Sequence, residues 1–170
     1  MASRQPYITQ RRTLLIVVEG DTEFAFCRYL KATLSRGQNL EVKIKSAHGG
    51  SPDKIVEFTR RHAKQGDYDS IAIVFDDDKP LTKKGQTMAR GLKAQLFPFT
   101  PCIEGFFLRL MGRSAPKDSY SCKSDFHQHG LSEKEKLDHD AYGSLFPSTE
   151  FHRLSSNEQF AALVKLFNNL

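Results

Sequence analysis

Residues 13–23 of the chain have the sequence TLLIVVEGDTE, and this stretch decides the expected fold. The run from Thr13 to Val18 is β-branched or leucine with no polar alternation, which is typical of a strand buried on both faces of a parallel sheet. The strand ends at Glu19-Gly20, and from Asp21 onward the apolar residues recur at helical spacing. We therefore predict a strand, a tight turn and a helix.

The same kind of unit follows along the chain. Further strands are expected at residues 40–45, 70–75 and 96–101, helices at 51–64 and 82–95, and a C-terminal amphipathic helix at 156–167. Strands that alternate with helices across short turns rich in Gly, Pro and Asp indicate βαβ units. The expected fold class is α/β, with a mostly parallel four-stranded sheet and helices on both of its faces.

Composition and length indicate one folded domain. The chain has 170 residues, of which 39% are hydrophobic and 26% charged, and this excludes a disordered or low-complexity protein. We expect a basic, flexible arm at residues 1–12 and a single domain at 13–170, with a loop-rich insertion near 113–140. Apolar runs are too short to span a bilayer, and three irregularly spaced cysteines form no disulfide framework, so a cytoplasmic location is expected.

The middle of the chain is its most basic part. The formal net charge is +5, and residues 79–123 hold nine basic residues against Glu104 and Asp118. Such a stretch is either a solvated helix face or the binding surface of an anionic partner. We expect a nucleic acid, DNA or RNA, whose phosphates contact side chains in and near this stretch, namely Lys79, Lys83, Lys84, Arg109 and the turn residue His48.

Acidic residues follow the expected strands. Glu19, Asp76, Asp78 and Glu104 lie at strand ends, and Glu23 lies one helical turn after Glu19. Any one of them alone is explained as a turn or capping residue. Carboxyl ends of parallel strands meet at one edge of a sheet, however, where clustered carboxylates require a cation. Hard oxygen ligands favour Mg²⁺ or Mn²⁺, with Asp77 turned aside to solvent.

Two segments resemble a known superfamily. LLIVVEGDTEF at 14–24, followed by YDSIAIVFDDDKP at 68–80, is similar to the Toprim domain of topoisomerases, primases and OLD-type nucleases. Within it, Glu-Gly-x-Thr-Glu with a downstream Pro-Cys-x-Glu, and the closing FPSTEFHRL, resemble RloB-like proteins. The resemblance implies a Toprim-like fold and a metal-dependent nuclease of phage defence or restriction, with an endonuclease favoured. It assigns Glu19 as general acid, general base or metal ligand, Asp76 and Asp78 as the metal pair, and Glu23 as a second catalytic acid.

The sequence also bears on binding partners and on functions other than a nuclease. The chain has no P-loop motif, so any ATP-driven step requires another protein, and the resemblance implies an ABC-type ATPase partner. Formation of a homo-oligomer is a further possibility. The alternatives are a catalytically silent subunit that binds nucleic acid or a partner within an ATPase-containing complex, and a receiver-like signalling domain. Cys122, His127, His129 and His139 fit no common zinc-finger spacing.

Overall fold

The computed structural model describes residues 11–168, which form a three-layer α/β domain. Its strands are β1 (Arg12–Val18), β2 (Leu40–Ser46), β3 (Ser70–Asp76) and β4 (Gln95–Phe99). They form one sheet in the order β2-β1-β3-β4, and all three pairings are parallel. The predicted α/β class with a four-stranded sheet is confirmed, and the sheet is entirely parallel.

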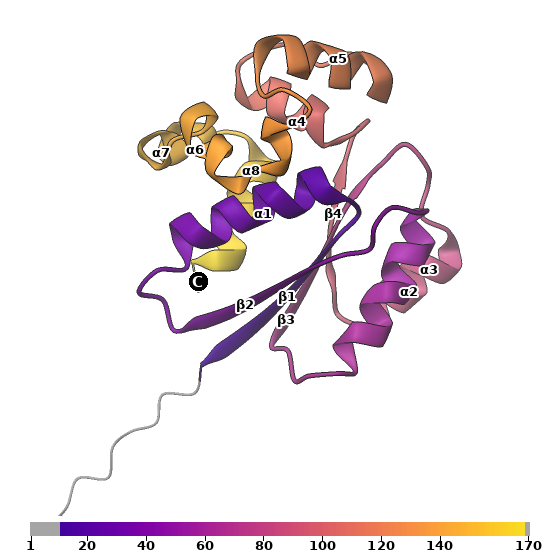
Figure 1. The fold of residues 1–170 in the computed structure, drawn as a ribbon. Helices are drawn as coiled ribbons and strands as arrows, with labels where there is room; N and C mark the ends of the chain where they lie inside the picture. Colours follow the sequence, from indigo (N-terminus) through magenta and orange to yellow (C-terminus); the bar gives the residue numbers. More distant parts are fainter. Residues whose placement is uncertain (1–10, 169–170) are drawn as a thin grey trace, which may run out of the picture.

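Helices cover both faces of this sheet. In chain order they are α1 (Asp21–Leu34), α2 (Pro52–Ala63), α3 (Lys83–Gly91), α4 (Ile103–Leu110), α5 (Ser119–His129), α6 (Tyr142–Leu145), α7 (Phe151–Leu154) and α8 (Glu158–Phe167). Figure 1 shows α2 and α3 on one face and α1 on the other, with the helices from α4 to α8 gathered on the α1 side. Three short 3₁₀ turns, at Glu135–Leu137, His139–Ala141 and Ser148–Glu150, connect the later helices.

Two hydrophobic cores explain why the first strand shows no polar alternation. Leu14, Ile16 and Val18 of β1 pack into the large core on the α1 side. The intervening Leu15 and Val17 pack into the smaller core beneath α2 and α3. Because both faces of the central strands are buried, every position from 14 to 18 is apolar.

Strand order determines where a ligand can bind. The chain passes from β1 to β2 on one side, then crosses β1 to form β3 and β4 on the other. In open α/β sheets, ligands bind in the crevice outside the carboxyl ends of the strands where the strand order reverses, and here that position lies beyond β1 and β3. The residues that immediately follow these two strands are therefore the first candidates for a functional site.

Several predicted boundaries are wrong. The segment 113–140, expected to be rich in loops, contains the helix α5. Asp118 caps this helix, and its side chain accepts a hydrogen bond of 2.8 Å from the Ser121 N–H. Only Cys122 and Phe126 of α5 are buried, so its sequence shows no apolar period. The helix predicted to reach Gln95 ends at Gly91 instead, because Gln95 begins β4.

The two chain ends also differ from expectation. The C-terminal helix, predicted at 156–167, begins at Glu158 and is capped by Asn157, whose side chain accepts a hydrogen bond from the Phe160 N–H. Of the arm predicted at residues 1–12, residues 1–10 lie outside the described part of the chain, and Arg12 begins β1.

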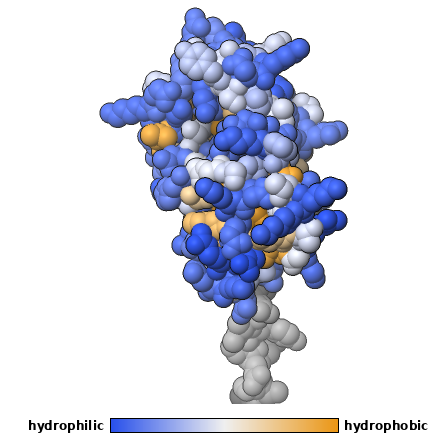
Figure 2. Space-filling model, turned by 90° about the vertical axis from the view of Figure 1, so that its right-hand side faces the viewer, coloured by the Kyte–Doolittle hydropathy of each residue, from blue (hydrophilic) through white to orange (hydrophobic). Residues whose placement is uncertain are grey.

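The surface is mainly polar. On the face shown in Figure 2, hydrophobic residues form only small, separate patches. Leu96, Tyr120 and Leu137 are the large hydrophobic side chains that are exposed among residues 11–168. None of the helices in that range has the length and apolar character needed to cross a membrane.

Candidate active site at the carboxyl ends of the strands

The first two acidic residues of the site meet across the crevice between β1 and β3. Glu19 follows β1 directly, and Asp76 is the last residue of β3. These strands are neighbours in register, with Val18 opposite Val74, so their ends emerge side by side. One carboxylate oxygen of Glu19, Oε2, accepts a hydrogen bond of 2.9 Å from the backbone N–H of Asp76. The pairing of the two strands therefore fixes the position of Glu19.

Two helix N-termini contribute the other buried acids. Glu23 lies in the first turn of α1, where its Oε2 accepts a hydrogen bond of 3.2 Å from the Gly20 N–H. Glu104 lies in the first turn of α4 and is 1% exposed. The N-terminus of α4 also holds Asp76, whose Oδ1 accepts a hydrogen bond of 2.9 Å from the Ile103 N–H. Peptide N–H groups at helix starts stabilise carboxylates, which explains why this arrangement is tolerated.

Burial and mutual repulsion perturb the ionisation of this cluster. Burial, followed by the charges of Glu23, Glu19 and Glu104, raises the pKa of Asp76 to about 9. Burial, together with the charges of Glu104 and Glu19, outweighs the hydrogen bonds from backbone N–H groups and raises the pKa of Glu23 to about 7. Burial likewise raises the pKa of Glu19. In this cluster, burial and mutual repulsion together outweigh the effect of the positive charges near Glu19, those of Lys123 and Lys79.

One atom of the cluster has no partner at all. Oε2 of Glu104 is the only buried side-chain oxygen or nitrogen in residues 11–168 that makes no hydrogen bond. Leaving such an atom unsatisfied costs roughly 1–3 kcal/mol, and more when it is charged. Ligand atoms of Asp76, Cys102 and Glu104 all lie within 4.8 Å of one another. This donor set, with an unpartnered buried oxygen, fits a divalent cation.

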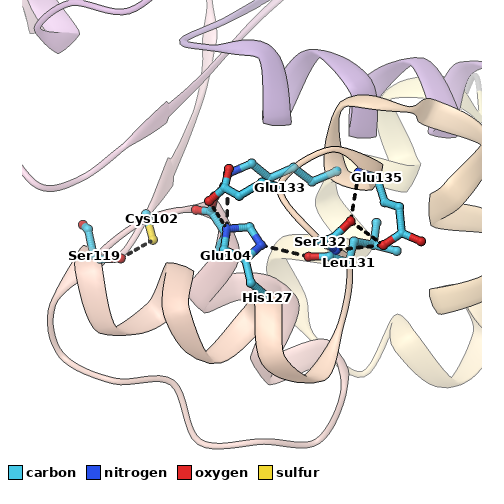
Figure 3. Close-up of polar contacts among 9 residues, drawn as sticks. Cys102, Glu104, Ser119, His127, Leu131, Ser132, Glu133 and Glu135 are labelled. Atoms are coloured by element: carbon cyan, nitrogen blue, oxygen red, sulfur yellow. Dashed lines mark hydrogen bonds and ion pairs between the residues drawn. The ribbon is translucent and has the colours of Figure 1, made fainter.

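A lysine missed by the sequence analysis lies beside the cluster. Lys136 Nζ is 3.6 Å from Oε1 of Glu104 and 2.9 Å from Oε2 of Glu133, and its side chain is largely buried. Figure 3 shows Glu104 of α4 near His127 of α5 and near Glu133, which lies on the segment that follows α5. Nothing in the local sequence marks Lys136, because its contact with Glu104 joins segments far apart in the chain.

A second lysine that interacts electrostatically with the acidic cluster is Lys123 on α5. Burial acts to lower its pKa, but the charges of Glu104 and Asp76 outweigh this effect and raise the pKa overall. The sequence placed Lys123 in the basic stretch without assigning it a role. The structure brings the charge of Lys123 near the acids of the cluster. Lys123 is therefore a better candidate for a phosphate contact at the site than the exposed Lys83 and Lys84 at the start of α3.

The remaining residues of the triple-aspartate turn lie at the rim. Asp78 is exposed, yet close enough for its charge to add to the rise in the pKa of Glu19. Asp77 is exposed as well, and its Oδ2 accepts a hydrogen bond of 3.1 Å from the Thr100 hydroxyl. Of the predicted set, Glu23 and Glu104 are thus buried, Glu19 and Asp76 are partly buried, and Asp78 borders them.

The predicted phosphate-binding residues are spread over a wider area. Lys79 lies near enough to Glu19 to lower its pKa, although burial has the larger and opposite effect. Lys83 and Lys84 are exposed at the start of α3. Arg109 Nη1 donates a hydrogen bond of 3.1 Å to the Thr100 carbonyl. His48 is exposed in the turn after β2, 4.0 Å from Asp21.

The cysteine and histidines considered for zinc do not converge. Cys122 is buried and donates to the Pro116 carbonyl, and His127 pairs with Glu133. Only two groups of three possible ligands occur in the described residues, and neither contains Cys122, His127 or His129. The second of these groups, Asp138, His139 and Asp140, comprises consecutive residues near the surface.

Fold and site together define a class of protein. It is a parallel α/β domain with a carboxylate cluster at the point where its strand order reverses. The sequence profile of the RloB-like protein family matches residues 14–159, and the chain belongs to this family. Comparisons with curated proteins and with solved structures gave no match.

Proposed function

We propose that this protein is a metal-dependent nuclease of the Toprim type, which hydrolyses phosphodiester bonds in DNA or RNA. The observation that carries the proposal is the convergence of Glu19, Asp76 and Glu104 in the crevice between β1 and β3. The order of the strands, with a glutamate after β1 and Asp-x-Asp at the end of β3, supports the Toprim assignment.

Each group in the site has a role in this proposal. Asp76, Glu104 and Glu19 would hold a divalent cation, Mg²⁺ or Mn²⁺, with Glu23 and Asp78 beside them. Such a cation activates a water molecule and stabilises the leaving oxygen. The Ile103 N–H orients Asp76, and the Asp76 N–H in turn orients Glu19 toward the crevice. Lys79 and Lys123 would bind phosphate groups of the substrate at the rim.

Partners are proposed on the family resemblance. An ABC-type ATPase partner would supply the ATP-driven step, and the nuclease would act as the effector of a defence system. A catalytically silent subunit remains the second candidate, because the exposed lysines Lys83 and Lys84 suit a docking surface whether or not the site is active.

Cleavage assays test the proposal. Labelled plasmid, single-stranded DNA and tRNA are incubated with the purified protein and Mg²⁺ or Mn²⁺, beside Asp76→Asn and Glu19→Gln. We expect wild-type protein to cleave one substrate, and both variants to lose at least ~100-fold in rate. Asp77→Asn is the matched control, because Asp77 is exposed and bonded to Thr100. Equal cleavage by all variants would disprove the assignment of the site.

A further inference from the structure

The cation site contains a sulfur atom. Cys102 is the residue immediately before α4, and it is completely buried. Its Sγ lies within 4.8 Å of a carboxylate oxygen of Asp76 and a carboxylate oxygen of Glu104. The three residues come from the end of β3 and the start of α4, two elements joined by the hydrogen bond from the Ile103 N–H to Asp76. The sulfur therefore belongs to a rigid part of the site.

The unpartnered oxygen of Glu104 independently indicates a ligand at this position. Lys136 approaches only Oε1, at 3.6 Å, and Oε2 makes no hydrogen bond although its side chain is buried. A buried carboxylate oxygen without a partner is costly, and a bound cation removes that cost. Glu104 shares its group of ligand atoms with Cys102, so the cation that satisfies Glu104 comes within reach of the thiol.

The spacing of the ligand atoms is compatible with one ion. Transition metals bind carboxylate oxygens at about 2.1 Å and thiolate sulfur at about 2.3 Å, so two such ligands of one ion are at most roughly 4.4 Å apart. The atoms of Asp76, Cys102 and Glu104 lie within 4.8 Å of one another. Small side-chain rotations are enough to bring all three to bonding distance.

We propose that Cys102 is a ligand of this cation and that its sulfur makes the site prefer Mn²⁺, Co²⁺ or Zn²⁺ over Mg²⁺. This inference rests on the proposed function, since it concerns the same cation. On binding, the S–H bond breaks, the proton passes to solvent and a bond forms between sulfur and metal. Mg²⁺ gains little from sulfur because it requires oxygen ligands in octahedral geometry, whereas thiolate favours transition metals.

A purely structural role for Cys102 makes a different prediction. Its present hydrogen bond, to the Ser119 carbonyl, is long at 3.9 Å and appears as a dashed line in Figure 3. Thiols are weak donors, so this contact does not hold the sulfur away from the carboxylates. If Cys102 only fills space between α4 and α5, its replacement alters stability and leaves the choice of metal unchanged.

Titration with Co²⁺ separates the two roles. The full chain is titrated while its absorption spectrum is recorded, because a thiolate ligand produces a sulfur-to-cobalt charge-transfer band in the near ultraviolet. We expect this band in the wild-type protein and in Cys122→Ala, a matched control that removes a neighbouring buried thiol outside the ligand group. In Cys102→Ser, the band is lost, and the preference for Co²⁺ over Mg²⁺ falls by roughly tenfold or more in competition.

Each other result has a distinct meaning. If calorimetry shows that wild-type protein binds Co²⁺ but its spectrum has no charge-transfer band, the proposed role of Cys102 is wrong. The proposed nuclease function is not affected by that result. A band that persists in Cys102→Ser would overturn the role of Cys102 too, by assigning the sulfur to another cysteine. If wild-type protein binds none of Mg²⁺, Mn²⁺ and Co²⁺, both the inference and the proposed function fail. If the serine variant does not fold, a missing wild-type band still overturns the inference, and a band kept by both Cys122→Ala and Cys27→Ala still assigns the sulfur to Cys102, because the chain has three cysteines.

Discussion

Oε2 of Glu19 accepts a 2.9 Å hydrogen bond from the backbone N–H of Asp76, across the boundary between β1 and β3. This contact joins two strand ends that are far apart in the chain and adjacent in the sheet. It places two carboxylates at the same end of the crevice, where the start of α4 adds Glu104. The cluster is therefore a direct product of the strand order, and its electrostatics can be tested without a substrate.

Stability without metal is expected to decrease as the pH rises. The folded-state pKa is about 7 for Glu23 and about 9 for Asp76, above ordinary values of 4.5 and 3.8. A carboxyl with a raised folded-state pKa contributes stability that is complete below the ordinary pKa and is lost as the pH rises through the folded-state value. In EDTA, the urea concentration at the midpoint of unfolding should therefore decrease as the pH is raised from about 5 to about 9.

Two further measurements make this prediction specific to the site. The decrease of the urea midpoint should be smaller in Asp76→Asn, because an asparagine side chain cannot ionise. It should also be smaller in wild-type protein when Mn²⁺ is present at the higher pH. A wild-type midpoint that does not change with pH would contradict the perturbed ionisation of Glu23 and Asp76.

Lys136 is expected to stabilise the protein when no metal is bound. Its Nζ is the cation nearest to Oε1 of the buried Glu104 side chain, at 3.6 Å. Lys136→Met leaves that oxygen without a charged partner, so unfolding in urea with EDTA should become easier by about 1–3 kcal/mol. Lys134→Met is the control, because Lys134 is exposed, and its effect should stay within about 0.5 kcal/mol. Equal losses in the two variants would show that Glu104 does not depend on Lys136.

Two glycines of α3 should respond in opposite directions to alanine. A Cβ on Gly85 would lie 2.5 Å from Oδ1 of Asp53, a carboxylate that accepts a hydrogen bond from the Thr82 N–H. Gly85→Ala displaces Asp53 and should cost about 1–3 kcal/mol. A Cβ on Gly91 meets no atom within 4 Å, so Gly91→Ala should stabilise by about 0.4–1 kcal/mol. Urea denaturation measures both, and a stable Gly85→Ala would mean that the contact with Asp53 is not close.

The sequence predicts the sheet and the strand-end acids because both follow from local patterns. Apolar runs without alternation mark β1 and β3 as buried on both faces, and parallel strands bring Glu19 and Asp76 to one edge. The helix α5 is not predicted because only Cys122 and Phe126 of it are buried, so its sequence has no helical repeat of apolar residues.

Other parts of the site depend on contacts that no local pattern encodes. Lys136 reaches Glu104 only after the chain has passed through α5 and the following turn. Cys102 is visible in the Pro-Cys-x-Glu motif, but its distance to Asp76 depends on how α4 begins after β4. Tertiary packing therefore decides both positions.

Calorimetric titration with Mn²⁺ measures directly whether the carboxylates at the ends of β1 and β3 bind a cation. Wild-type protein, Asp76→Asn and Asp77→Asn are titrated under the same conditions, since the two aspartates are adjacent and only Asp76 belongs to the buried cluster. We expect saturable Mn²⁺ binding by wild-type protein and Asp77→Asn, with affinity reduced roughly tenfold or more in Asp76→Asn. Equal affinity in all three proteins, or no binding by wild-type protein, would contradict a cation site between β1 and β3.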